Sequence, residues 1–183
     1  LEIQNQITLH PENRVLVVGD GKLGQLIART LKQTGCYLCV AGRHDDKLAM
    51  LSNLDIVTLS VGPATSIDRE PTTRLRDFDV AIECTGNPEG FGFALRALRP
   101  RGTLVLKSTY ADRLTLDISS LVVDEITLVG SRCGPFEPAI KLLRDGSVSV
   151  EELITDRYPL SAGITAFDHA QRPGTIKVLL QIS

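Results

Sequence analysis

The sequence predicts an α/β protein with a doubly wound parallel sheet of six strands, followed by a smaller C-terminal α/β extension. Three observations support this prediction. Short apolar runs alternate with stretches of helical spacing between Val15 and Gly130, and several of these runs are apolar on both faces. No internal repeat or low-complexity segment interrupts the alternation. Strands separated by helices pair in parallel through right-handed crossovers, which place helices on both faces of the sheet.

The predicted strands are short, as is usual for buried parallel sheets. They cover residues 15–18, 37–41, 54–59, 78–83, 103–107 and 125–130. Helices are expected from the end of the first strand to Gly35, over 45–51, and from Pro88 to about residue 98, with a loop at 62–71 and a turn or short helix at 72–76. Each predicted helix links two strands of the sheet.

The pattern changes after Pro135. A helix is expected at 136–144, a further element at 150–155, a helix near 164–171 and a final strand at 175–182. The final strand is strongly β-prone, and we expect it to pair outside the main sheet. The sequence therefore predicts two domains, residues 1–134 and 135–183.

The apolar run 15–18 leads directly into Gly19-x-Gly21-x-x-Gly24, which opens a helix. Gly19 permits the tight turn, Gly21 admits a pyrophosphate close to the backbone, and Gly24 allows close helix–strand packing. The unpaired N–H groups and the dipole of the helix N-terminus attract a diphosphate. The motif predicts a Rossmann-type dinucleotide site that includes Lys22 and Leu23, and the alternative is a glycine-rich turn without a ligand.

The second strand ends in Gly42-Arg43-His44. A carboxylate at this place binds the adenosine ribose of NAD, whereas a basic residue accommodates the 2′-phosphate of NADP. Gly42 carries no carboxylate and Arg43 offers charge-assisted hydrogen bonds, so NADP is expected. His44 and Lys47 are included in the site. NAD stays open, because Arg43 could stack on adenine or face solvent, and Asp45 and Asp46 could bind the ribose.

Other strand ends should lie at the same edge of the sheet, where ligands bind to open parallel sheets. Thr85 and Gly86 follow the fourth strand, and Lys107 and Ser108 follow the fifth. We expect both loops to form walls of the cofactor site.

The bulk properties are those of an ordinary globular protein. Of 183 residues, 43% are hydrophobic, and the formal net charge of −2 gives no basic footprint for nucleic acid or an anionic membrane. No apolar run approaches the ~20 residues that span a bilayer, and no signal peptide is visible. Cys36 and Cys39 point to opposite faces of a predicted strand, so they are expected to be core thiols in a reducing compartment. A cytoplasmic protein is predicted.

The sequence offers no catalytic set. His10, His44 and His169 lie in separate segments, and no cysteine, histidine and acidic residues have the spacing of a zinc site. No Gly-x-Ser-x-Gly turn and no Tyr-x-x-x-Lys pair is present. The chain is therefore expected to bind a redox cofactor and to hold neither catalytic residues nor a metal.

Several stretches, in order along the chain, resemble the rear portion of zinc-type alcohol dehydrogenases of the medium-chain dehydrogenase/reductase family. They are RVLVVGDGKLGQL at 14–26, VAIECTG at 80–86, ALRPRGTLV at 97–105, ITLVGSRCG at 126–134, LITDRYPLSAGITAFDHA at 153–170 and IKVLL at 176–180. The resemblance extends over essentially the whole chain.

The resemblance implies that a GroES-like domain with the zinc ligands and most of the substrate pocket precedes this chain, which begins with leucine rather than methionine. It implies an enzyme that interconverts an alcohol and an aldehyde or ketone, with this portion inactive alone and residues 135–183 packing against the preceding domain. Ser131, Arg132 and Cys133 would line the nicotinamide, and Lys177 would approach the pyrophosphate. Residues 125–130 would form a homodimer edge.

Two alternatives stay open: a stand-alone nucleotide-binding or oligomerisation module, and part of a zinc-independent, quinone-reductase-like enzyme. Gly42 departs from the acidic residue of the NAD-using members, which favours NADP.

Overall fold

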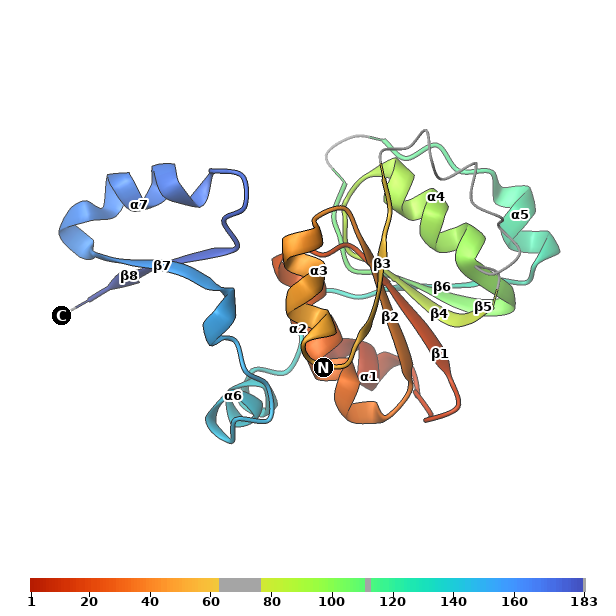
Figure 1. The fold of residues 1–183 in the computed structure, drawn as a ribbon. Helices are drawn as coiled ribbons and strands as arrows, with labels where there is room; N and C mark the ends of the chain where they lie inside the picture. Colours follow the sequence, from red (N-terminus) through yellow and green to blue (C-terminus); the bar gives the residue numbers. More distant parts are fainter. Residues whose placement is uncertain (63–76, 111–112, 183) are drawn as a thin grey trace. The chain divides into compact units, whose positions relative to one another are not determined.

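The computed structural model describes residues 1–62, 77–110 and 113–182 (Figure 1). The chain forms two compact units, Leu1–Ile140 and Lys141–Ser183. No described helix has the length and apolar character needed to cross a membrane.

The larger unit contains a six-stranded sheet with the order β3-β2-β1-β4-β5-β6, and every neighbouring pair is parallel (Figure 1). The strands are β1 (Arg14–Val18), β2 (Tyr37–Gly42), β3 (Val57–Ser60), β4 (Phe78–Glu83), β5 (Leu98–Leu106) and β6 (Thr127–Gly130). The chain runs outward from β1 to β3, returns to β4 beside β1, and continues to β6. The order of the strands therefore reverses between β1 and β4, which is where ligands bind in such sheets.

Helices cover both faces of this sheet (Figure 1). They are α1 (Glu2–Gln6), α2 (Lys22–Leu31), α3 (Asp45–Ser52), α4 (Pro88–Ala97) and α5 (Ile118–Val123). Val15 and Val17 point into one core with residues of α1, α2 and α3, whereas Leu16 and Val18 point into a second core with residues of α4. Successive strand residues face opposite sides of a sheet, so an all-apolar strand serves both cores. The predicted doubly wound α/β fold is confirmed.

Most predicted elements coincide with observed ones. Gly35 ends the first helical segment in the left-handed conformation (φ +75°), after a 3-10 turn at Lys32–Thr34. In α4, Pro88 follows the N-cap Asn87, whose side chain accepts from the Gly90 N–H at 2.8 Å. These local signals are short-range, which explains why the sequence predicted them well.

Several boundaries differ from the prediction, among them the starts of the third, fifth and sixth strands, and the helix α5 was not predicted. The third strand begins at Val57 rather than at residue 54, because the chain still turns at Asp55 (φ +55°). The fifth strand begins at Leu98, which pairs with Phe78 before an irregularity that precedes the regular pairing from Thr103. Pro100 lies in this irregular stretch, where its missing N–H costs no regular sheet hydrogen bond.

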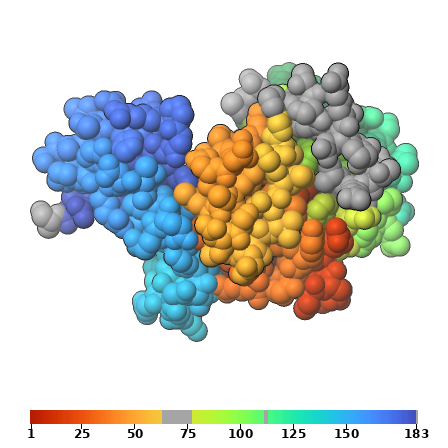
Figure 2. All heavy atoms as spheres, in the orientation of Figure 1, coloured from red at the N-terminus to blue at the C-terminus, as the bar shows by residue number. Residues whose placement is uncertain are grey.

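The sixth strand starts at Thr127 rather than at residue 125. From residue 63 on, the predicted loop and turn over 62–76 lie outside the described residues. In the space-filling view, side chains of α3 and β3, in orange to yellow, form one continuous surface of the larger unit (Figure 2).

In the smaller unit, β7 (Ile154–Pro159) and β8 (Lys177–Gln181) form a two-stranded parallel sheet with α7 (Gly163–Ala170) between them in the chain. The helix α6 (Phe136–Arg144), predicted with these bounds, leads into this unit, and short 3-10 turns at Glu151–Leu153 and Leu160–Ala162 flank β7. The predicted element at 150–155 is the first of these turns and the start of β7. The last strand pairs outside the main sheet, as predicted.

Candidate functional site

The turn between β1 and α2 is shaped by two of its three glycines. Gly19 has φ +121°, and a Cβ there would lie 3.0 Å from the Cys84 Sγ. A Cβ on Gly24 would lie only 1.9 Å from the carbonyl oxygen of Gly19. The tight turn predicted for Gly19 and the close packing predicted for Gly24 are both observed, because any side chain would separate α2 from the turn.

Gly21 differs from these two glycines. It is the N-cap residue of α2, with φ −70°, and a Cβ there would meet no atom within 4 Å. The free chain does not need glycine at this position for its own packing. The space beside Gly21 is open and the first residues of α2, Lys22 and Leu23, are exposed, as the approach of a diphosphate to this helix N-terminus requires.

A cavity of about 240 Å³ lies beside this turn, at the carboxyl ends of β1, β2 and β4. Its position matches the reversal of strand order between β1 and β4. Five of the predicted site residues line it: Gly19, Gly21, Arg43, His44 and Thr85. The structure therefore brings the glycine-rich turn, the end of β2 and the loop after β4 together around one space.

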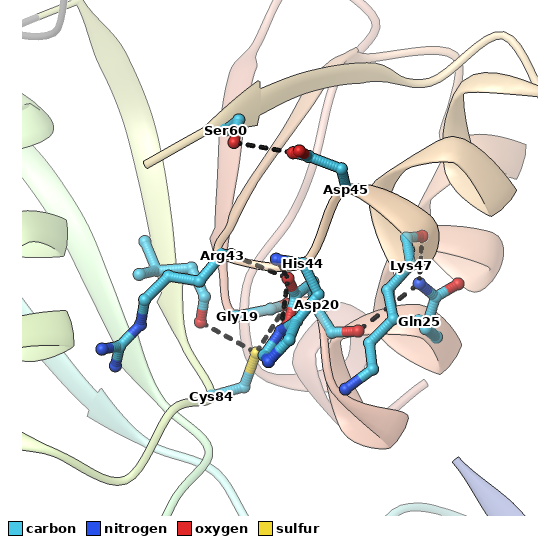
Figure 3. Close-up of polar contacts among 10 residues, drawn as sticks. Gly19, Asp20, Gln25, Arg43, His44, Asp45, Lys47, Ser60 and Cys84 are labelled. Carbon is cyan, nitrogen blue, oxygen red and sulfur yellow. Dashed lines mark hydrogen bonds and ion pairs between the residues drawn. The ribbon is translucent and has the colours of Figure 1, made fainter. Parts of the chain in front are cut away.

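Several residues of the cavity lining were not assigned to the site from the sequence, and Asp20 is the most buried acidic residue among them. Asp20, in the glycine-rich turn, is 5% exposed, and its carboxylate reaches the end of β2 (Figure 3). It accepts hydrogen bonds from the backbone N–H groups of Arg43 (2.8 Å) and His44 (2.7 Å) and contacts the His44 Nδ1 at 2.9 Å. The sequence did contain a signal for Asp20. An acidic residue lies inside the glycine motif, while the second strand ends in Gly42 and not in an acid.

The side chains of Arg43 and His44 stand at the mouth of the cavity. Both are about half exposed, and the Arg43 guanidinium lies 3.9 Å from the Glu89 carboxylate on α4. The neighbouring Asp45 accepts from the Ser60 hydroxyl at 2.9 Å (Figure 3). Lys47 lies on α3 outside the cavity lining, where its carbonyl accepts from the Gln25 side chain at 2.8 Å.

A second buried carboxylate organises the loop after β4. Glu83 is fully buried, and its Oε1 accepts from the Thr85 N–H and hydroxyl, both at 2.5 Å, and from the Gly86 N–H at 3.0 Å. Its Oε2 accepts from the Tyr110 hydroxyl at 2.7 Å. Burial and this carboxylate raise the pKa of Tyr110 above its ordinary value. Glu83 was predicted as a strand residue only.

Cys84 lies beneath the glycine-rich turn, where its thiol donates to the Val18 carbonyl at 3.0 Å. Burial, together with the charges of Glu83 and Asp20, raises the pKa of this thiol to about 12. All four cysteines have free thiols, and Cys39 is buried while Cys133 is exposed. Of the two predicted core thiols, Cys39 therefore lies in the core and Cys36 is only partly buried.

The predicted residues after β5 and β6 also come together. The Lys107 ammonium donates to the Ser131 hydroxyl at 3.3 Å and to the Arg132 carbonyl. Burial lowers the pKa of Lys107. A Cβ on Gly86 would lie 3.5 Å from the Ser108 Cβ, so the loops after β4 and β5 touch.

Other predicted residues lie outside the cavity lining. Lys22, Leu23 and Gly24 belong to the first turns of α2. Lys177 belongs to the smaller unit, on β8. The cavity thus accounts for part of the predicted site, and the role of the remaining residues stays a prediction.

Among the described residues, no group of three or more histidine, cysteine or acidic side chains is placed so that it could hold a metal ion. The residue His169, in the smaller unit, instead contacts the Tyr158 hydroxyl through its Nδ1 at 2.9 Å.

Residues 23–145 match the family of zinc-binding dehydrogenases, and the chain belongs to this family. D-arabitol-phosphate dehydrogenase of Enterococcus avium is 25% identical over 181 residues, which are 94% of this chain and 51% of that protein. The chain spans about half the length of the curated relatives it matches.

Solved structures have the same fold. A zinc-binding dehydrogenase of Sinorhizobium meliloti 1021 bound to NADP matches 97% of this chain and 55% of its own, with a TM-score of 0.84 and 19% identity. An alcohol dehydrogenase of Escherichia coli CFT073 complexed with NADH matches 99% of this chain and 56% of its own, with a TM-score of 0.86 and 19% identity. The chain therefore has the fold of one portion of such enzymes.

Proposed function

We propose that this chain is the dinucleotide-binding portion of an NADP-dependent oxidoreductase that interconverts an alcohol and an aldehyde or ketone. A polyol is the substrate class that the relatives favour. The observation that carries the proposal is the open space beside Gly21, at the N-terminus of α2 and at the reversal of strand order. The residues present fit the pyrophosphate of a dinucleotide. Gly21 is the one motif glycine whose Cβ would enter free space rather than meet protein atoms.

Each part of the site has a separate task in this proposal. The first N–H groups of α2 bind the pyrophosphate, and Arg43 binds the adenosine 2′-phosphate. Glu83 orients the Thr85–Gly86 loop, and Lys107 orients Ser131 and Arg132, at the strand ends that would face the nicotinamide ribose. Bound nicotinamide would supply the hydride acceptor or donor.

The rest of the enzyme is proposed to lie outside this chain. The zinc implied by the family has no cluster of ligands among the described residues, so we derive no step through it. We assign the zinc ligands and the substrate pocket to a preceding domain that packs against residues 135–183. This chain alone is then inactive, and its cytoplasmic location remains a prediction.

The edge strand β6 is proposed to form a homodimer by pairing with its twin. Thr127 and Leu128 are exposed on this strand, which is the last in the sheet order. An exposed edge favours pairing with another strand. Sedimentation of the wild-type chain and of Leu128→Glu tests this, and a dimer that survives the substitution would contradict the assignment.

Calorimetric titration with NADPH and NADH tests the proposed function. Gly21→Val should keep the fold, because its side chain enters open space, and should abolish binding by filling the diphosphate position. Gly24→Ala is the matched control that should lose the fold itself, because its Cβ would lie 1.9 Å from a carbonyl oxygen. Retained affinity in Gly21→Val, or a wild-type chain that binds neither nucleotide below millimolar concentration, would contradict the proposal.

A further inference from the structure

We infer that Asp20 is a positioning residue that determines the nucleotide specificity of this site. Its carboxylate excludes a side chain from the end of β2 and holds Arg43 and His44 where they can receive a phosphomonoester, the 2′-phosphate of NADPH. This inference rests on the proposed function and adds a residue that the sequence analysis did not assign.

The first argument is steric. A Cβ on Gly42 would lie 2.4 Å from the Asp20 Oδ2, 2.5 Å from its Cβ and 2.6 Å from its Cγ. Any residue other than glycine at the end of β2 would therefore overlap the Asp20 side chain. Asp20, in the conformation that it has here, and an acidic residue at position 42 therefore exclude one another.

The second argument concerns what the Asp20 carboxylate binds. Its Oδ2 accepts two backbone N–H groups and its Oδ1 contacts the His44 ring, while the side chain is only 7% exposed (Figure 3). Two N–H dipoles and an imidazole thus face this carboxylate. These donors reduce the repulsion between the Asp20 carboxylate and an incoming phosphate. They also occupy the carboxylate with the β2–α3 loop, so that it is not free to bind a ribose.

The third argument concerns the groups left for the ligand. Since His44 donates from Nδ1 to Asp20, its half-exposed ring keeps Nε2 for the ligand, and Nε2 can donate to a phosphate oxygen when both ring nitrogens are protonated and Asp20 balances the charge. Arg43, whose backbone is held by the same carboxylate, has its guanidinium 3.9 Å from the Glu89 carboxylate. A half-exposed ion pair of this length is weak, and a phosphate dianion can replace Glu89 as the partner of Arg43.

Binding of NADPH and NADH to matched variants of the whole chain tests the inference. Asp20→Asn keeps the size of the side chain but replaces one acceptor oxygen by an amide NH₂, which cannot accept from the Arg43 and His44 N–H groups. We expect its affinity for NADPH to fall about tenfold, which is the loss of one charge-assisted hydrogen bond, and its affinity for NADH to change less than about twofold. Gly42→Asp alone should lose both nucleotides, because of the overlap with Asp20.

The double variant Asp20→Gly with Gly42→Asp removes the overlap and should bind NADH in preference to NADPH by about tenfold. Asp20→Ala with Gly42→Asp is its control. This variant should not recover binding, because the Cβ of residue 20 would itself lie 2.5 Å from the new Cβ. Circular dichroism checks that each variant has folded.

Nitrogen-15 NMR of the ligand-free chain gives a readout independent of binding. The neutral His44 ring should carry its proton on Nδ1 in the wild type and lose that preference in Asp20→Asn. A neutral ring that carries its proton on Nε2 in the wild type would overturn the inference. So would wild-type binding with an NADPH/NADH ratio that Asp20→Asn and the double variant leave unchanged. If the wild type binds neither nucleotide, the proposed function fails and this inference fails with it.

Discussion

Two buried carboxylates organise the carboxyl edge of the same sheet, and they do so in different ways. Glu83, at the end of β4, is fully buried and receives hydrogen bonds from its own loop and from Tyr110. Asp20, after β1, is 5% exposed and reaches across to residues 23 and 24 positions further along the chain. One carboxylate closes its own turn, and the other fixes a neighbouring loop.

This difference indicates that Glu83 contributes mainly to the stability of the fold, and Asp20 mainly to the choice of ligand. All donors to Glu83 are neutral N–H or O–H groups, and losing the carboxylate would leave them buried without a partner, which is costly. The partners of Asp20 lead instead to a half-exposed histidine and arginine at the cavity mouth. We therefore expect changes at Glu83 to affect folding, and changes at Asp20 to affect ligand choice.

The largest expected effect is that of Glu83→Ala. This change should lower the free energy of unfolding by about 3 kcal/mol, because the Thr85 and Gly86 N–H groups and the Tyr110 hydroxyl lose their acceptor. Asp20→Ala should lower the free energy of unfolding by only about half as much, since the Arg43 and His44 N–H groups can donate to water instead. Urea unfolding of both variants measures the difference. Equal losses would remove the distinction between the two carboxylates.

Tyr110→Phe tests the role of Glu83 by removing one of its donors, the Tyr110 hydroxyl. It should cost about 2 kcal/mol at neutral pH, because the Glu83 Oε2 loses its partner. Burial and Glu83 raise the pKa of Tyr110 in the folded chain above 10.0. The contribution of the tyrosine is therefore fully present below pH 10.0 and is lost as the pH rises through the folded pKa. Unfolding free energies from pH 7 to 11 test this, and a deficit that grows above pH 10.0 would contradict it.

A third carboxylate, Asp79 near the start of β4, provides a more exposed reference. It accepts from the Arg14 N–H at 2.7 Å and from the Arg99 Nε at 2.6 Å. Burial alone would raise the pKa of Asp79, but these hydrogen bonds outweigh it, and the pKa is lowered.

Asp79→Asn should cost about 1 kcal/mol near pH 7, less than the Tyr110 change, because the side chain of Arg99 is half exposed. The lowered pKa stabilises the fold above the pKa of the unfolded chain, and this stability is lost as the pH falls through the folded value. The deficit of the variant should therefore shrink toward pH 3. Thermal unfolding across the acid range measures it, and a deficit independent of pH would speak against the ion pair.

The smallest expected effect is that of Glu89→Gln. Removing the carboxylate that pairs with Arg43 at 3.9 Å should strengthen NADPH binding about twofold, since exposed pairs of this kind contribute less than ~1 kcal/mol. NADH binding should hardly change. Titrations at low and high salt measure both affinities, and an equal gain for NADH would show that Glu89 does not compete with the phosphate.

Local patterns predicted much of this fold. The strand 78–83 and the helix 136–144 were predicted with their observed bounds, and Gly19 and Gly24 show the geometry that their spacing implies. The start of β5 was missed, because its pairing with Phe78 lies across an irregularity that contains a proline. The short helix α5 was also missed, since six residues carry little periodicity.

The sequence by itself determined the alternation of strands and helices, the glycine turn and the predicted class of ligand, because these depend on neighbours within a few residues. Only the tertiary structure decided that Asp20 fills the space beside Gly42 and that Glu83 binds Tyr110. Those contacts join residues 22 and 27 positions apart, each linking the end of one strand to the loop after another. A parallel sheet brings such loops together through the order of its strands, and no local pattern contains that order.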